Sequence, residues 1–152
     1  MEALAFCLDT DVIIEFLKDK DSPASRFINE AKNKAQLFVT AITVYELLYG
    51  PKYAEYEREL DDVNSFLTWV GILAFDKESA EIAADIDVCL HKKGKPVGLR
   101  DVFIASICVK NNLPFITRNL THFNIIAEET EYKLKILSPE EALQALIKGF
   151  PR

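Results

Sequence analysis

The sequence of 152 residues has little of what marks disordered, fibrous or membrane-spanning chains. It contains only 5 glycines and 6 prolines, and 49% of its residues are hydrophobic, which excludes a disordered or collagen-like chain. The longest nearly apolar run, residues 102–109, has about a third of the length that crosses a bilayer, so we expect no membrane span. The N-terminus has no basic cluster, and we therefore expect no signal peptide.

Cysteine is scarce as well. The three cysteines, Cys7, Cys89 and Cys108, are odd in number, widely spaced and each surrounded by apolar residues. This usage predicts reduced core residues of a cytoplasmic protein, and it disfavours both a disulfide framework and a zinc site.

Positive charge is in deficit, with 18 basic against 24 acidic residues and a formal net charge of −6. This balance disfavours a protein that holds nucleic acid by bulk attraction. The charges are also unevenly distributed. Residues 46–87 contain eleven acidic residues, whereas residues 91–118 contain six basic residues and a single acid, Asp101. Charged runs usually form solvated helix faces, but an isolated acid inside a basic segment is a candidate functional group.

Short apolar runs of strand length alternate with helical patterns along the whole chain. The strands are predicted at residues 5–8, 37–40, 72–75, 114–117 and 135–137. The helices are predicted at 12–18, from 22, from 43 to about 50, and at 53–70, 77–93, 100–112 and from 138. Apolar strands joined by helices predict an α/β fold with a parallel sheet covered on both faces, formed by one domain (1–152, core about 4–142).

Three acidic residues are predicted to meet at one edge of this sheet. Asp9 directly follows the first strand, Glu46 lies on the first turn of the helix after the second, and Asp101 opens the helix that leads into the fourth. Ligands of open parallel sheets bind outside the carboxyl ends of the strands, which is the edge that these residues share. Each acid also has a structural explanation, because Asp9 could cap a helix, Glu46 stands at capping-box spacing from Thr43, and Asp101 favours a helix dipole.

Together the three carboxylates are harder to explain without a cation. Two carboxylates about 5 Å apart repel by roughly 3 kcal/mol at an effective dielectric constant near 20. Oxygen ligands without histidine or cysteine favour Mg²⁺ or Mn²⁺, and such an ion suits phosphodiester hydrolysis. The residues predicted to hold the substrate backbone are Lys92, Lys93, Lys95 and Arg118.

Four segments, in order, carry a resemblance to a known family. They are LDT at 8–10, TVYELLYG at 43–50, GLRDVFIA at 98–105 and FITRNLTHF at 115–123. The chain resembles the PIN domain, and within that family the VapC-like toxin ribonucleases of VapBC toxin–antitoxin pairs. The resemblance implies a three-layer α/β/α sandwich and an endoribonuclease that depends on Mg²⁺ or Mn²⁺. It also implies a homodimer and a VapB-like antitoxin that inserts a segment into the active-site groove.

The resemblance also assigns roles by position. Asp9, Glu46 and Asp101 would form the acidic metal site. Thr10 and Thr117 would support it with hydroxyl groups, and Asn119 would be the fourth catalytic position. Many relatives carry an acid in that last block, whereas this chain offers Asn119 and His122. An amide oxygen can bind a metal or position water but adds no charge. His122 could act as a general base or contact a phosphate, although a structural role in a loop is the simpler interpretation.

Two alternatives remain open from the sequence. Asp9-Thr10-Asp11-Val12 after a strand also resembles the opening motif of haloacid-dehalogenase-type phosphatases, in which Asp9 would be the nucleophile and Asp11 the general acid. The paired acids that this family expects late in the chain are not present at 117–120. The second alternative is a PIN-like module with weakened catalysis that binds RNA or a protein.

Overall fold

The computed structural model describes residues 4–149, which form five strands and eight helices. In chain order the elements are β1 (Leu4–Leu8), α1 (Thr10–Lys18), α2 (Pro23–Ala31), β2 (Ala35–Thr40), α3 (Ala41–Ala54), α4 (Glu57–Leu67), β3 (Gly71–Leu73), α5 (Lys77–Lys92), α6 (Leu99–Asn111), β4 (Phe115–Ile116), α7 (Leu120–Glu129), β5 (Ile136–Leu137) and α8 (Pro139–Lys148).

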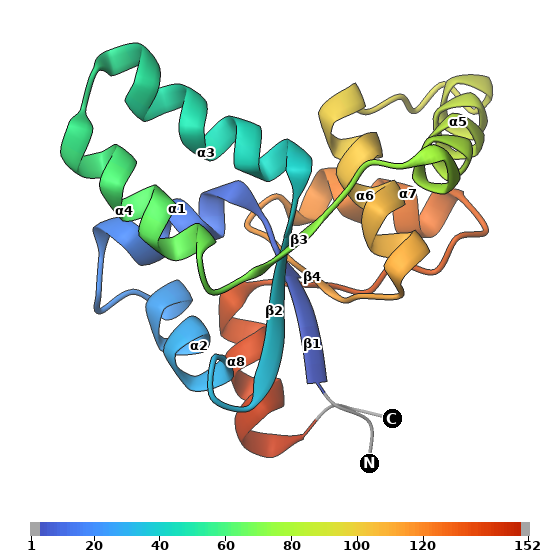
Figure 1. The fold of residues 1–152 in the computed structure, drawn as a ribbon. Coiled ribbons are helices and arrows are strands. Elements are labelled where there is room, and N and C mark those ends of the chain that lie inside the picture. The colour runs from blue at the N-terminus through green and yellow to red at the C-terminus, as the bar shows by residue number, and fades with distance from the viewer. Residues whose placement is uncertain (1–3, 150–152) are drawn as a thin grey trace.

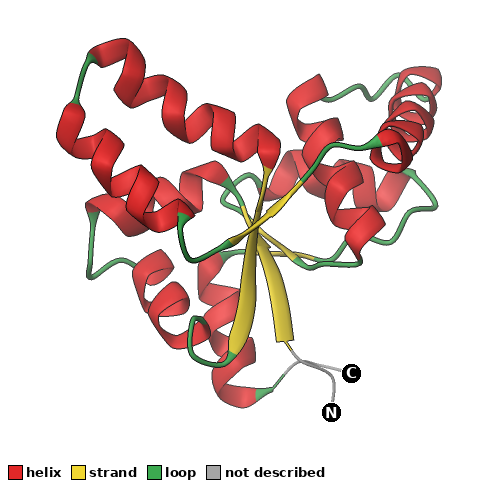
Figure 2. Cartoon of the chain, in the orientation of Figure 1, coloured by secondary structure: helices red, strands yellow, loops and turns green. Residues whose placement is uncertain are grey.

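The five strands form one parallel sheet in the order β3-β2-β1-β4-β5 (Figures 1 and 2). β1 lies at the centre, and the direction of winding reverses between β1 and β4. All carboxyl ends therefore point to one edge, and the reversal opens the position at which ligands of such sheets bind. The predicted α/β class with a central parallel sheet is confirmed.

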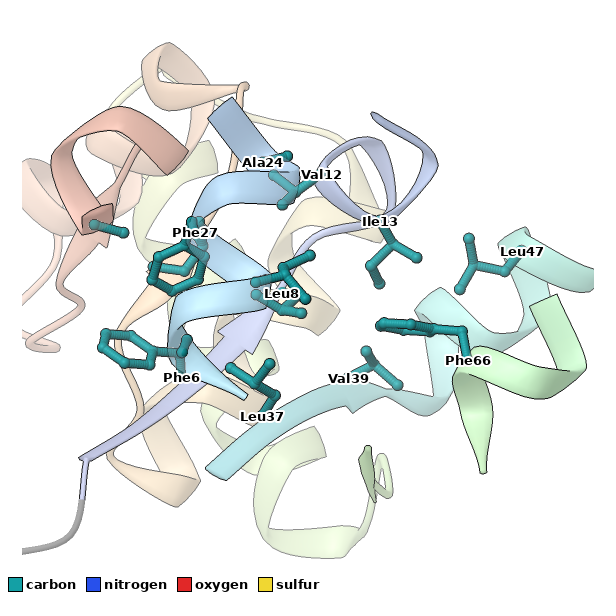
Figure 3. Close-up of a cluster of buried hydrophobic side chains, with 14 of the residues drawn as sticks. Phe6, Leu8, Val12, Ile13, Ala24, Phe27, Leu37, Val39, Leu47 and Phe66 are labelled. Atoms are coloured by element: carbon teal, nitrogen blue, oxygen red, sulfur yellow. The ribbon is translucent and has the colours of Figure 1, made fainter. Parts of the chain in front are cut away.

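Side chains on β1 alternate between two hydrophobic clusters, one on each face of the sheet. Phe6 and Leu8 pack into the first cluster, to which α1, α2, α3, α4 and α8 contribute (Figure 3). Cys7 points into the second cluster, which is formed with α5, α6 and α7. Figure 1 shows these two groups of helices on opposite sides of the sheet. The predicted α/β/α sandwich is confirmed.

The helix boundaries at α3 and α4 differ from the prediction. A break was expected near Gly50-Pro51, followed by one long helix over 53–70. Instead α3 continues through Pro51 and ends at Glu55, whose φ of 58° is in the left-handed region. α4 then begins at Glu57 as a separate helix and packs against α3. The apolar faces of α1 and α4 are used inside the chain, because Val12, Val63 and Phe66 are buried in the first cluster.

α7 was not predicted at all. It is short, and its buried residues are only Phe123 and Ile126, spaced three apart. Its presence places His122 on the first turn of a helix rather than in a loop. The predicted helices over 77–93 and from 138 are both present. Ser138 and Glu141 form a capping box at the start of α8, and Gly94, just after α5, is in the left-handed region (φ 69°).

The cysteines have free thiols, with Cys7 and Cys108 buried and Cys89 only partly so. Among the helices of residues 4–149, none combines the length and apolar character needed to cross a bilayer.

Candidate active site

Asp9 lies at the reversal point of the sheet, between the ends of β1 and β4. Its backbone N–H donates to the carbonyl of Ile116 at 2.9 Å, which extends the pairing of the two strands by one residue. Its carboxylate accepts from the backbone N–H of Thr10 at 2.8 Å, so Asp9 caps α1 as one interpretation of the sequence expected. The side chain is nevertheless only 2% exposed, and a helix cap alone does not require such burial.

Glu46 reaches the same point from α3. The cap of this helix is Thr40, whose hydroxyl accepts from the backbone N–H of Thr43 at 3.2 Å. α3 thus starts earlier than predicted, and Glu46 lies on its second turn instead of its first. The capping-box interpretation of Glu46 is wrong. Its Oε1 accepts instead from the hydroxyl of Thr10 at 2.5 Å, which ties α3 to the start of α1.

Asp101 lies on the first turn of α6, as predicted, and its side chain is 8% exposed. Its Oδ2 lies 3.1 Å from Nδ1 of His122 on α7. The side-chain amide nitrogen of Asn119 lies 3.2 Å from the same His122 nitrogen. Asn119 therefore reaches Asp101 only through His122. Both residues of the segment at 115–123 that replace the usual acid, Asn119 and His122, thus lie at the site.

One side chain that the sequence did not single out contacts all three acids. The guanidinium of Arg100 donates from Nη2 to Oδ1 of Asp9 at 2.7 Å and from Nη1 to Oδ1 of Asp101 at 2.8 Å. It binds Glu46 with two hydrogen bonds, from Nε at 2.7 Å and from Nη2 at 2.9 Å. Its only local signal was its place directly before Asp101 on the first turn of α6, which does not report the contacts with Asp9 and Glu46.

These contacts set the charge state of the site. Burial disfavours the charged form of Arg100, but the carboxylates of Glu46 and Asp9 outweigh burial and raise the pKa of the guanidinium above its ordinary value. Burial likewise opposes ionisation of Glu46, yet hydrogen bonds from Arg100 and Thr10 lower the pKa of this carboxyl. Both groups are therefore charged at neutral pH, and the cluster contains a genuine ion pair.

The two predicted supporting threonines lie behind the carboxylates. The hydroxyl of Thr117 donates to Oδ2 of Asp9 at 2.7 Å and accepts from the backbone N–H of Asn119 at 2.9 Å. Thr10 donates to Glu46, as described above. Both threonines are buried, so these hydrogen bonds hold the acids in place with little competition from water.

Three of the four basic residues predicted to hold substrate have carboxylate partners within the chain. Arg118 forms two hydrogen bonds with Glu15 of α1 and two with Glu140 of α8. Lys95 pairs with Glu129 at 2.6 Å, and Lys93 donates to the carbonyl of Glu129 at 2.6 Å. Glu129 ends α7, so these lysines lie roughly 14 Å along that helix from its start at the acidic cluster. Lys92 is exposed at the end of α5.

The donor set suits a hard divalent cation in chemistry, because it offers carboxylate oxygens and neighbouring hydroxyls. The carboxylates already converge on one cation, the guanidinium of Arg100. As the side chains stand, however, no three carboxylate, imidazole or thiol groups in residues 4–149 are arranged as ligands of one metal ion. The donors therefore fit Mg²⁺ or Mn²⁺ by type.

A groove lies beside Glu46, between α1, α3 and α4. It has a volume of about 290 Å³ and a mainly apolar lining that includes Ile14, Leu17, Leu47 and Val63. Glu46 is one of the residues that line it, so the groove adjoins one of the three carboxylates.

The fold and the site together define an α/β protein with a carboxylate cluster at the reversal point of a parallel sheet. The family model of the PIN domain matches residues 6–129, and the chain belongs to this family. The resemblance seen in the sequence is thereby confirmed. The phosphatase alternative is wrong, because the match to the PIN family covers the segments on which that alternative depended.

Characterised proteins similar to this chain bear ribonuclease names. The chain is 32% identical over 130 residues to ribonuclease VapC2 of Haemophilus influenzae, covering 84% of this chain and 97% of that protein. It is 33% identical over 124 residues to the tRNA(fMet)-specific endonuclease VapC of Salmonella typhimurium. The match covers 81% of this chain and 92% of that protein.

Solved structures give the same result. The DNA-bound VapBC of Salmonella typhimurium superposes with a TM-score of 0.77 at 30% identity, covering 90% of this chain and 98% of that chain. VapBC2 of Rickettsia felis, bound to a DNA fragment from its promoter, superposes with a TM-score of 0.78 at 19% identity, covering 89% of this chain and 98% of that chain. At this low identity the similarity bears on the fold alone.

Proposed function

We propose that this chain is a VapC-type endoribonuclease, the toxin of a toxin–antitoxin pair, which hydrolyses RNA phosphodiester bonds with the help of Mg²⁺ or Mn²⁺. The observation that carries the proposal is the convergence of Asp9, Glu46 and Asp101 on a single cation at the reversal point of the sheet. The ribonuclease names of relatives at 32% and 33% identity support it.

In this proposal Asp9, Glu46 and Asp101 hold the ion. The ion would polarise the phosphoryl oxygen and lower the pKa of a bound water. Thr117 and Thr10 fix the rotamers of Asp9 and Glu46 through the hydrogen bonds described above. His122 and Asn119, adjacent to Asp101, would orient the attacking water or the leaving oxygen. An amide replaces a carboxylate at this fourth position, so it adds orientation without negative charge.

The same proposal includes partners. The groove beside Glu46 is a suitable place for the inserted segment of a VapB-like antitoxin, because its lining is mainly apolar and includes Glu46. The similar structure from Salmonella typhimurium, at 30% identity, is that of a VapBC complex, which supports such a partner. We further propose a homodimer, a cytoplasmic location, and contact of Lys92, Lys93, Lys95 and Arg118 with the RNA backbone.

The test is cleavage of a mixed structured RNA by the wild type, by Asp9→Asn and by Asp61→Asn, each with Mg²⁺, Mn²⁺ or EDTA. Asp61→Asn is the matched control, because this aspartate is exposed on α4. We expect Asp9→Asn and EDTA to lower the rate about a thousandfold, or roughly 4 kcal/mol of transition-state stabilisation, with no change for Asp61→Asn.

A second candidate function is a binding module with weakened catalysis. The observation that favours it is the neutral Asn119 in the fourth position, together with the partial neutralisation of the acids by Arg100. In this case the same assay would show equal traces of cutting in all variants, indifferent to EDTA. RNA affinity would then be the same for the wild type and for Asp9→Asn.

A further inference from the structure

Arg100 uses most of the oxygen atoms that a metal ion would need. Of the six carboxylate oxygens of Asp9, Glu46 and Asp101, four accept hydrogen bonds from the guanidinium. The other two are engaged by a threonine hydroxyl and a histidine ring nitrogen. All six oxygens therefore have a partner, and a divalent ion at 2.0–2.2 Å from them cannot share these positions with the guanidinium.

We propose that Arg100 is the built-in cation of the metal-free site, and that a divalent metal ion binds by displacing its guanidinium from the three carboxylates. The inference rests on the proposed function in one respect, since it takes metal binding at this site as given. It goes beyond that function by assigning to Arg100 the control of metal affinity.

The charges favour an exchange over simultaneous binding. The three carboxylates carry a formal charge of −3, which the single charge of Arg100 reduces to −2. A divalent cation in its place reduces the charge to −1, so it compensates the acids better. A metal ion next to the retained guanidinium would instead place two cations within a few ångströms, where they repel.

The burial of Asp9, Asp101 and Arg100 shows which of these side chains can move. The side chains of Asp9 and Asp101 are 2% and 8% exposed. Both also have partners other than Arg100, because Thr10 and Thr117 donate to Asp9 and His122 lies 3.1 Å from Asp101. The side chain of Arg100 is 34% exposed and long, so its charged end can turn into water. Asp9 and Asp101 thus form the fixed part of the site, and Arg100 is the part that can leave.

Two consequences follow for the metal-free protein. Arg100 offsets part of the repulsion that the three neighbouring carboxylates would otherwise exert on each other, so the site stays assembled without metal. The same contacts must be broken before a metal ion binds, so Arg100 weakens metal affinity. Removing the guanidinium should therefore destabilise the metal-free chain and strengthen its binding of metal.

The experiment is calorimetric titration of Mn²⁺ into metal-free wild type, Arg100→Gln, Arg100→Lys and Arg26→Gln, with folding checked by circular dichroism. Arg26 is exposed on α2 and provides a matched change of charge. We expect Arg100→Gln to bind Mn²⁺ at least tenfold more tightly than the wild type, with a lower Tm in EDTA and a larger rise of Tm with Mn²⁺. Arg100→Lys keeps the charge but loses the paired hydrogen bonds of the guanidinium, so its Mn²⁺ affinity should lie between those of the wild type and Arg100→Gln. The Mn²⁺ affinity of Arg26→Gln should equal that of the wild type.

A direct reading on the wild type complements the variants. The Nε–H of Arg100, hydrogen-bonded to Glu46, should give a slowly exchanging ¹⁵N signal that is missing in Arg100→Lys. Titration with Mg²⁺ should shift this signal and accelerate its exchange with water. Equal Mn²⁺ affinity of the wild type and both Arg100 variants, with an unmoved Nε–H signal, would overturn the inference and leave the proposed function intact. Lack of Mn²⁺ binding by every variant would overturn both.

Discussion

The hydroxyl of Thr117 donates a 2.7 Å hydrogen bond to Oδ2 of Asp9, although 108 positions separate the two residues. Asp9 ends the central strand and Thr117 ends its neighbour, so the bond joins the two sides of the point where the sheet reverses its winding. The Asp9 side chain is 2% exposed, and water cannot easily replace the lost donor. The bond therefore fixes the orientation of a buried carboxylate.

Replacement of Thr117 by valine removes this donor while keeping the shape of the side chain. We expect Thr117→Val to lower the free energy of unfolding by roughly 1–3 kcal/mol, the cost of an unsatisfied buried polar group. Urea denaturation in EDTA measures the change. Thr117→Ser keeps the hydroxyl and should recover most of the loss; equal midpoints for wild type and Thr117→Val would show that the bond contributes nothing.

Asp11 should make stability depend on pH. Burial, together with the nearby Asp9 carboxylate, raises the pKa of Asp11 from 3.8 to about 6. Because the folded chain favours the protonated form, the wild type should lose stability as pH rises from about 4 to about 6 and should not regain it above that range. One carboxylate oxygen of Asp11 is buried without a hydrogen-bond partner, which agrees with this direction.

Asp11→Asn removes the titrating group. We expect it to be more stable than the wild type at pH 7.5 by about 1 kcal/mol, a figure discounted for solvent screening of a partly exposed group. The difference should disappear below about pH 4. Unfolding curves at both pH values, with Asp61→Asn as the control, test the expectation. A variant that is less stable than the wild type at pH 7.5 would contradict it.

The ion pairs of Arg118 should stabilise the folded chain at neutral pH and lose this effect in acid, the opposite of the pH dependence expected for Asp11. Burial opposes ionisation of Glu15 and Glu140, but the hydrogen bonds from Arg118 outweigh it and lower the pKa of both carboxyls. This contribution is present above the ordinary glutamate pKa of 4.5 and is lost as pH falls below it.

Arg118→Gln should therefore lower stability at pH 7 by about 1 kcal/mol, since the network is partly screened by water. Near pH 3 it should have little effect. Measurement of Tm at the two pH values, with Arg26→Gln alongside, separates this network from a general effect of charge. A loss of equal size at both pH values would mean that packing of the Arg118 stem, and not its charge, is responsible.

The lysines at the end of α5 should affect RNA binding rather than the chemical step. They lie roughly 14 Å from the start of α7, so they can contact the RNA backbone only outside the cleaved bond. We expect the triple change Lys92→Gln, Lys93→Gln and Lys95→Gln to raise KM and to leave kcat unchanged. In an Asp9→Asn background, the slope of log affinity against log salt should fall by about 2, since each contact with single-stranded RNA contributes about 0.7.

A control for charge is a second triple glutamine variant at three exposed lysines in the turns before and after α2, Lys20, Lys32 and Lys34. It should leave the salt slope unchanged. If both triple variants change the slope equally, the RNA responds to total charge and the end of α5 is not a binding surface.

Much of the fold and of the acidic cluster is readable from local patterns. The strand runs, the caps at Ser22 and Asp76 and the terminator Gly94 predict the order of the elements, because each depends on residues close together in the chain. The convergence of Asp9, Glu46 and Asp101 follows from one rule about the edge of a parallel sheet.

The incorrect or missing predictions concern features that local sequence patterns do not determine. Pro51 usually ends a helix, yet packing of α3 against α4 keeps its backbone helical to Ala54. α7 shows only two buried residues, Phe123 and Ile126, too few for a clear periodic signal. The role of Arg100 was missed because its partners Asp9 and Glu46 lie 91 and 54 positions away, and no local pattern reports such pairs.

The position of Thr117 also sets the time at which the site can first exist during synthesis. The partner strand β4 and the hydroxyl of Thr117 are made 108 residues after Asp9. At a translation rate of about 5–20 residues per second, this interval is roughly 5–20 s. During that time the central strand has no neighbour on one side and the carboxylates are unassembled. A nascent or truncated chain that ends before β4 would therefore lack the assembled carboxylate site, so the site can form only after β4 has been made.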